Sequence, residues 1–144
     1  MNPNLVSDIK NAEGCVLIAY KDTNGYRTIG YGHKLQEGIN WEGHEISLAT
    51  AEELLKQDLD DAQTDAKALP EWSCMVTLAR ENALIELVFN MGSHTWQGFV
   101  KCRDAMIAKN WEQAGNELVD SLWAKQVGKA RSERLEKYIK SGTY

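Results

Sequence analysis

The chain has 144 residues, of which 43% are hydrophobic and 26% are charged, so its composition is that of one globular domain and not of a disordered segment. Its 16 Lys and Arg residues against 21 Asp and Glu residues give a net charge of −5 at pH 7, which argues against nucleic acid as its main partner. Cys15, Cys74 and Cys102 are odd in number and widely spaced, which argues against a disulfide framework or a zinc ribbon. We interpret them as small hydrophobic residues in a reducing compartment.

The N-terminus and the charge distribution suggest where the chain acts. The first ten residues lack the apolar core of a signal peptide, and the longest apolar run, 15–20, is far shorter than the ~20 residues that span a membrane. We therefore expect a soluble chain made in the cytoplasm, without membrane insertion. Residues 121–144 carry six basic and two acidic residues, a net +4 that leaves −9 for the other 120. This segment is either a solvated basic helix or a patch for an anionic ligand.

The N-terminal third predicts one short helix followed by a β-hairpin. Apolar residues recur at helical spacing over 3–13, Pro3 suits an early helical position, and Gly14 stands where a C-terminal cap belongs. Two segments of strand-forming residues, 16–20 and 26–29, then flank a cluster of turn-forming residues. We predict a hairpin with a glycine-rich exit.

A long helix is predicted next, after an irregular loop over 36–46. It begins at Ser47 or Thr50, and Thr50 with Glu53 has the spacing of a capping box. One apolar stripe runs along the helix in steps of four and three until Pro70 ends it. At ~1.5 Å per residue the helix would span roughly 30 Å, which is long enough to join two lobes.

The second half of the chain predicts only helices. Residues 71–91 form one long helical segment that is apolar almost all round near its end, as in the middle of a helical core, and a break follows at 92–94. Shorter amphipathic helices are predicted over 97–108, 111–119 and 129–140. The predicted fold class is therefore α+β, a single domain over 1–144 with three parts: a β-hairpin lobe over 14–46, an interdomain helix over 47–70 and a helical lobe over 71–144 packed with the helix 3–13.

Three polar residues around the hairpin form a candidate catalytic set. Glu13 lies in the last turn of the first helix, where the macrodipole disfavours negative charge by ~0.3–1 kcal/mol and so favours the protonated form that a general acid needs. Asp22 opens the turn and Thr28 lies on the returning strand, so all three could face one cleft. Singly, they also fit a solvated helix end, a self-bonded turn and an ordinary strand position. Together, two carboxylates and a hydroxyl around a groove are the parts of a glycosidase.

The segment 13–33 resembles the active-site segment of the phage-type lysozymes, best known from the T-even bacteriophages. Those enzymes carry Glu, then Asp nine positions later, then Thr six positions after that, followed by Ile-Gly-x-Gly-His, and every spacing holds here. The similarity continues in Gln-Asp-Leu-Asp at 57–60 and in Val-Phe-Asn-Met-Gly at 88–92. It covers essentially the whole chain, with a shorter loop between hairpin and long helix, and implies a lysozyme-like fold.

The resemblance implies an endolysin that hydrolyses the β-1,4 bond between N-acetylmuramic acid and N-acetylglucosamine in bacterial peptidoglycan. Glu13 would be the general acid that protonates the leaving oxygen. Asp22, on the opposite face of the sugar, would activate a water together with Thr28 and invert the configuration. No metal or cofactor is implied, because acid, base and water complete the chemistry.

The resemblance also implies supporting roles for residues outside the catalytic set. His33 and Asp58 would form a structural ion pair with His33 protonated, against a competing interpretation of His33 as a metal ligand. Lys34 and Phe89 would bind substrate at the cleft, although Phe89 also fits a plain core position.

Three positions depart from the family's pattern. Cys102 and Glu117 occupy two cleft positions of the T-even enzymes with different residue types. Arg131 is our candidate for the family's arginine near the catalytic glutamate.

The implied partner is bacterial peptidoglycan, and we expect a monomer stored in the host cytoplasm. A separate holin would let it reach the periplasm and cell wall at lysis. The alternatives are a lytic transglycosylase, which also begins with a Glu acid, and a non-catalytic peptidoglycan-binding module on the same fold. A tail-associated lysozyme is a further possibility, which we expect to be fused to spike domains. The intact Glu13, Asp22 and Thr28 favour an enzyme, because binding alone requires no acid and base.

Overall fold

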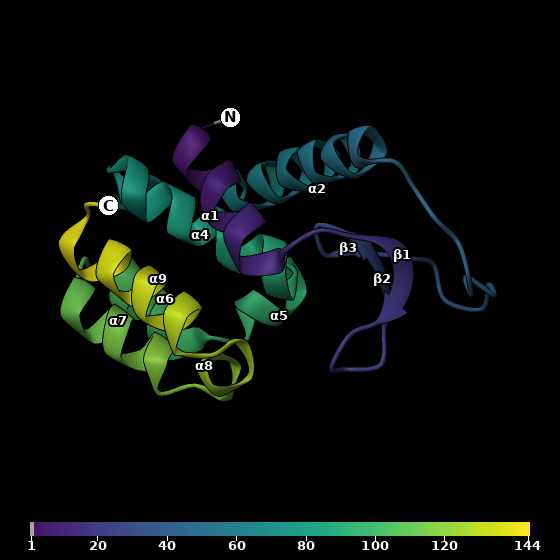
Figure 1. The fold of residues 1–144 in the computed structure, drawn as a ribbon. Helices are drawn as coiled ribbons and strands as arrows, with labels where there is room; N and C mark the ends of the chain where they lie inside the picture. Colours follow the sequence, from purple (N-terminus) through teal and green to yellow (C-terminus); the bar gives the residue numbers. More distant parts are fainter. Residues whose placement is uncertain (1) are drawn as a thin grey trace. The chain divides into compact units, whose positions relative to one another are not determined.

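The computed structural model describes residues 2–144, and the chain divides into two compact units, Met1–Asp61 and Ala62–Tyr144. The first unit holds a short helix, a small antiparallel sheet and most of a long helix, and the second is built of helices (Figure 1). The predicted α+β class is confirmed. Among residues 2–144, no helix is both long enough and apolar enough to cross a bilayer.

The N-terminal helix α1 (Pro3–Glu13) has the predicted bounds, because both of its ends are capped. The side chain of Asn2 accepts a hydrogen bond from the backbone N–H of Asn4 at 2.9 Å. At the other end, Gly14 has φ +64° and donates its N–H to the carbonyl of Lys10, which stops the helix. Glu13 is therefore the last residue of α1, at the point where the chain turns into the sheet.

Three strands form one antiparallel sheet in the order β1-β2-β3: β1 (Val16–Lys21), β2 (Arg27–Gly30) and β3 (His33–Lys34). The register places Tyr20 opposite Thr28 on one side and Lys34 opposite Thr28 on the other. The prediction of a hairpin alone missed β3. Gly30 and Gly32 have φ of +65° and +75°, and these left-handed positions turn the chain back onto β2.

The segment 36–46, predicted as an irregular loop, pairs its last residues with the outer edge of β1. Ala19 donates its N–H to the carbonyl of His44, and Ile46 donates its N–H to the carbonyl of Leu17, both at 2.9 Å. These bonds occupy backbone groups that an edge strand would otherwise leave open. The loop therefore completes the sheet without forming a full strand.

The long helix α2 (Leu48–Lys67) contains the boundary between the two units. Its cap is Ser47, whose Oγ accepts the N–H of Thr50 at 3.1 Å, so the predicted capping box that begins at Thr50 is wrong. The helix ends three residues before Pro70. The predicted apolar stripe is buried, although its last member lies beyond the end of the helix; its members are Leu55, Leu59, Ala62, Ala66 and Leu69.

Seven helices are described in the second unit: α3 (Trp72–Met75), α4 (Leu78–Met91), α5 (Ser93–Gln97), α6 (Val100–Ile107), α7 (Trp111–Val119), α8 (Leu122–Val127) and α9 (Lys129–Ser141). The single helix predicted over 71–91 is wrong, because Val76 has φ +61° and breaks it. Thr77 then starts α4 by accepting the N–H of Arg80 at 3.3 Å. The short helices α5 and α8 were missed, since five or six residues show no clear period.

A buried ion pair in the second unit is centred on Glu71, whose side chain has no exposed surface. Its Oε2 accepts from Nε of Arg103 at 2.7 Å and from Nε1 of Trp96 at 2.8 Å, and its Oε1 accepts from Nη2 of Arg103 at 3.1 Å. Burial raises the pKa of Glu71, but the hydrogen bonds from Arg103, from the backbone and from Trp96 outweigh it and leave the pKa lowered.

The basic segment over 121–144 is less positive at its surface than its sequence suggests. Arg131 and Arg134 both bind Glu86 of α4, with Nε of Arg131 2.8 Å from Oε2. Lys140 contacts Glu112 at 3.3 Å and the carboxylate of Glu136 at 3.0 Å. The exposed cations that remain for a ligand are those of Lys125, Lys129 and Lys137.

Candidate active site

The carboxyl group of Glu13 lies against Gly32 at the turn between β2 and β3. A Cβ atom at position 32 would lie 2.5 Å from Oε2 of Glu13 and 2.9 Å from its Cδ. Because real Cβ atoms do not approach so closely, the space for this carboxyl exists only while residue 32 is glycine. The second glycine of the Gly-x-Gly-His motif thus has a physical role that the sequence did not reveal.

We expect Gly32→Ala to reduce turnover by about a hundredfold, since a displacement of ~1 Å at a reacting group has effects of this size. The methyl group would displace the Glu13 carboxyl, while the backbone strain at φ +75° costs ~1–2 kcal/mol. Initial rates of the glycosidase reaction that the resemblance implies and the melting temperature should be measured together. Gly38→Ala is the matched control, because Gly38 has φ +82° with nothing within 4 Å of its Cβ. Equal losses of turnover in both variants would assign the effect to backbone strain.

Asp22 holds the hairpin turn with one of its two carboxylate oxygens. Its Oδ1 accepts the backbone N–H groups of Asn24 and Tyr26, each at 2.9 Å. This is the self-bonded turn that the sequence predicts for an aspartate at this position. Since both bonds use Oδ1, the turn role leaves Oδ2 for other chemistry.

Thr28 lies on β2 with only 3% of its surface exposed. Its hydroxyl donates to the carbonyl of Tyr26 at 3.0 Å. Because the hydroxyl proton is used in this bond, the lone pairs of Oγ1 remain to accept a hydrogen from a water molecule. Thr28 can therefore orient a water without giving up a proton.

Tyr20 is a residue of this region that the sequence reasoning missed. It lies directly opposite Thr28, so the two side chains are on the same face of the sheet. Burial raises the pKa of the Tyr20 phenol, and the negative charges of Glu13 and Asp22 raise it further. The side chains of Glu13 and Asp22 therefore each lie within electrostatic range of the Tyr20 phenol, and all three residues belong to the first unit. Strand alternation would have found Tyr20 once the register was known.

His33 and Asp58 meet as the sequence analysis expected of a structural pair. Nδ1 of His33 on β3 lies 2.8 Å from Oδ2 of Asp58 on α2, and about a quarter of each side chain is exposed. The contact fixes the strand that follows Gly32 to the long helix. Among residues 2–144, no group of three His, Cys, Asp or Glu side chains is arranged to hold a metal ion.

A second polar cluster fixes the end of α1 and the turn around Gly32. Nζ of Lys10 lies 2.7 Å from Oε2 of Glu52 on α2, and the phenol of Tyr31 donates to Oε1 of Glu52 at 3.2 Å. Lys10 is one turn before Glu13, and Tyr31 is next to Gly32. The cluster therefore constrains both partners of the close approach between Glu13 and Gly32.

Of the remaining predicted positions, Lys34 lies on β3 in the first unit, and the others lie in the second unit. Phe89 is half-buried near the end of α4. Cys102 is buried on α6, where its Sγ donates to the carbonyl of Ala114 at 3.3 Å. Burial, followed by the charges of Glu117 and Glu71, raises the pKa of the Cys102 thiol to about 12, so this cysteine is a protonated packing residue. Cys15, in contrast, is exposed.

The family model for phage lysozyme matches residues 10–137, which is most of the chain. The chain belongs to the phage lysozyme family. The lysozyme is 30% identical to probable T4-type lysozyme 1 of Dictyostelium discoideum, over 96% of this chain and 97% of the relative. It is 31% identical to the endolysin of Salmonella phage P22, over 90% of this chain and 86% of the relative. It is also 32% identical to the pre-baseplate central spike protein Gp5 of Enterobacteria phage T4, over 98% of this chain but only 28% of the spike protein.

Family membership makes the lysozyme a glycoside hydrolase that lyses peptidoglycan. The motif that carries the resemblance, from Glu13 to His33, includes Gly32, which lies against the Glu13 carboxyl, and Tyr20, whose phenol feels the charges of Glu13 and Asp22. Two relatives match along nearly their whole length, whereas the chain spans about a quarter of the spike protein.

Proposed function

We propose that this lysozyme is an endolysin that hydrolyses the β-1,4 bond between N-acetylmuramic acid and N-acetylglucosamine. The observation that carries the proposal is the pair of carboxylates in one region of the first unit. Glu13 is held against Gly32, and Asp22 holds the adjoining turn with Oδ1 only. The negative charges of both carboxylates raise the pKa of the Tyr20 phenol.

In this proposal, Glu13 donates its proton to the glycosidic oxygen as the bond to C1 of the muramic acid breaks. A water held by Oγ1 of Thr28 and by Asp22 attacks C1 from the opposite face and gives its proton to Oδ2 of Asp22. The product is a reducing muramic acid end of inverted configuration. A proton relay then returns Glu13 to its acid form for the next cycle.

The hydroxyl of Thr28 favours hydrolysis over lytic transglycosylation. A transglycosylase uses the C6 hydroxyl of the muramic acid as its nucleophile and so needs no positioned water. Here, Thr28 donates its proton to a carbonyl and keeps its lone pairs for a water, and a second carboxylate is nearby to accept the proton. The Thr28 hydroxyl and the second carboxylate also favour an enzyme over a non-catalytic peptidoglycan-binding module, because binding alone requires neither.

Asp22→Asn tests the proposed base without disturbing the turn. The amide oxygen of asparagine can accept the same two N–H groups, so we expect the melting temperature to stay near that of the parent. The amide cannot accept a proton from water, so turnover on purified peptidoglycan should fall about 10²- to 10⁴-fold. Near-parental turnover would remove Asp22 from the mechanism.

We further propose that the lysozyme acts as a monomer on the peptidoglycan of its host. It would be stored in the host cytoplasm and released at lysis through a lesion made by a separate holin. The similarity to the P22 endolysin over 86% of that protein supports this role. The similarity to the T4 spike protein favours, as a second candidate, a lysozyme carried on the phage tail. Detection of the chain in purified phage particles would favour the second candidate, and its confinement to the cleared lysate the first.

A further inference from the structure

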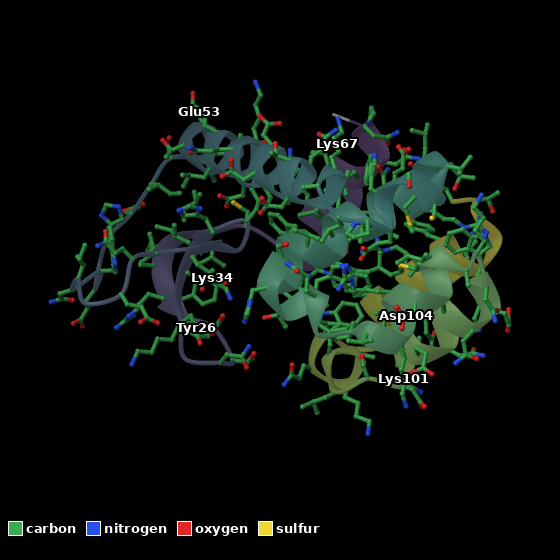
Figure 2. The ribbon with its side chains drawn as sticks, turned by 180° about the vertical axis from the view of Figure 1, so that it is seen from behind. Tyr26, Lys34, Glu53, Lys67, Lys101 and Asp104 are labelled. Carbon is green, nitrogen blue, oxygen red and sulfur yellow. The ribbon has the colours of Figure 1, made fainter. Side chains whose placement is uncertain are left out.

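Two side chains beside Thr28 form a small cationic surface on the sheet. Lys34 lies directly opposite Thr28 in the antiparallel pair of β2 and β3, so the two side chains share one face. Nζ of Lys34 lies 4.8 Å from the centroid of the Tyr26 ring, and Figure 2 shows the two side chains next to each other. This contact is a cation–π interaction, which positions the ammonium group over the ring.

The aromatic ring positions the Lys34 ammonium without neutralising it. Lys10 and Lys140 both have carboxylate partners, whereas no carboxylate of residues 2–144 forms an ion pair with Lys34. Tyr26 is 45% exposed and Lys34 is also exposed, so both are accessible to a large substrate. A full positive charge therefore lies beside Thr28, in a chain whose net charge is −5.

We propose that Lys34, positioned by Tyr26, is a specificity-determining residue that binds a carboxylate of the substrate. This inference rests on the proposed function, in which Thr28 lies at the reacting muramic acid. That sugar is the unit of the glycan whose lactyl group carries the peptide stem, and the stem bears free carboxylates. A lysine beside Thr28 would thus select peptide-substituted, anionic glycan over neutral glycan.

The test compares soluble peptidoglycan fragments that have free carboxylates with the same fragments after carbodiimide coupling to ammonia. The coupling converts the carboxylates into neutral amides and leaves the glycosidic bonds intact. On free fragments, Lys34→Met should raise KM about fivefold with kcat nearly unchanged, the size expected of an exposed ion pair. Lys34→Arg should retain most of the parental kcat/KM. On amidated fragments, the parent and Lys34→Met should have the same kcat/KM.

Two further variants separate this role from general effects. Tyr26→Leu should raise KM on free fragments by less than Lys34→Met does, since it keeps the charge of Lys34 but removes the aromatic ring that positions the ammonium group. Lys101→Met, which removes an exposed lysine of the second unit, should leave kcat/KM unchanged on both free and amidated fragments. An equal loss of kcat/KM in Lys34→Met on free and amidated fragments would overturn the proposal. An unchanged KM of this variant on free fragments would also overturn it.

The proposed function can fail separately from this inference. If the parent released no reducing ends from free fragments, the proposed reaction would be wrong. The dissociation constants of free and amidated fragments for parent and Lys34→Met, measured by calorimetry, would then still decide whether Lys34 binds carboxylate.

Discussion

Glu13→Gln is expected to lower turnover about a thousandfold or more, which is the effect of removing a general acid. Glutamine has nearly the same shape as glutamate, so it fills the space against Gly32 and leaves the fold intact. Its amide cannot donate the proton that the leaving oxygen needs. The measurement is the clearing rate of outer-membrane-permeabilised Gram-negative cells, with the melting temperature determined on the same preparation.

Glu53→Gln is the matched control, because Glu53 is an exposed glutamate of α2 in the same unit (Figure 2). It makes the same change of charge and should clear cells at the parental rate. Equal clearing rates for Glu13→Gln and the parent would contradict the assignment of Glu13. A collapse of the melting temperature in Glu13→Gln would instead indicate a structural role.

Glu71→Gln is expected to lower the free energy of unfolding by about 3 kcal/mol at neutral pH. The substitution leaves the guanidinium of Arg103 without its charged partner at a buried position, and losing one member of a buried pair typically costs this much. Chemical denaturation at pH 7 measures the difference. Glu133→Gln, an exposed residue of α9, is the control and should leave stability unchanged.

The effect of Glu71 should depend on pH with a definite sign. The pKa of Glu71 is lowered in the folded protein, so its contribution to stability is fully present above its unfolded pKa, near 4.5. That contribution is lost as the pH falls through the lower, folded pKa. The stability gap between parent and Glu71→Gln should therefore stay constant from pH 7 to about 5 and shrink below 4.5. A gap that widens on acidification would contradict the lowered pKa.

The elements that the sequence predicted well are those with local signals at both ends. The helix over 3–13 has Asn2 and Pro3 at its start and Gly14 at its end, and its bounds are the predicted ones. The helix over 111–119 likewise has a cap, since Asn110 accepts the N–H of Gln113. Capping bonds form within a few residues, so they can be read without knowledge of the rest of the fold.

The elements that the sequence missed depend on contacts between distant residues. The residues next to Val76 give no local signal of its left-handed conformation, which divides the helix predicted over 71–91. Glu86 lies in that same apolar stretch and is buried, because Arg131 and Arg134 approach it from a helix 45 residues later. Such pairing becomes visible only when the helices are packed.

The candidate site likewise has residues that the sequence alone could single out and residues whose roles depend on the fold. The spacing of Glu13, Asp22 and Thr28 was sufficient to single them out, because they belong to one short motif. The roles of Gly32 and Tyr20 needed the register of the sheet, which sets what faces the Glu13 carboxyl and what faces Thr28. Lys34 directly follows His33 of the Gly-x-Gly-His motif, so the sequence predicts it near the site. Its contact with the Tyr26 ring, however, depends on the folded hairpin.

The most direct test of the account is the chemistry of the newly formed ends after digestion of purified peptidoglycan in ¹⁸O-labelled water. Hydrolysis by Glu13, Asp22 and a positioned water predicts reducing N-acetylmuramic acid ends that carry one ¹⁸O atom at C1 and are released with inverted configuration. Anhydro-muramic ends without ¹⁸O, or reducing ends at N-acetylglucosamine, would contradict it.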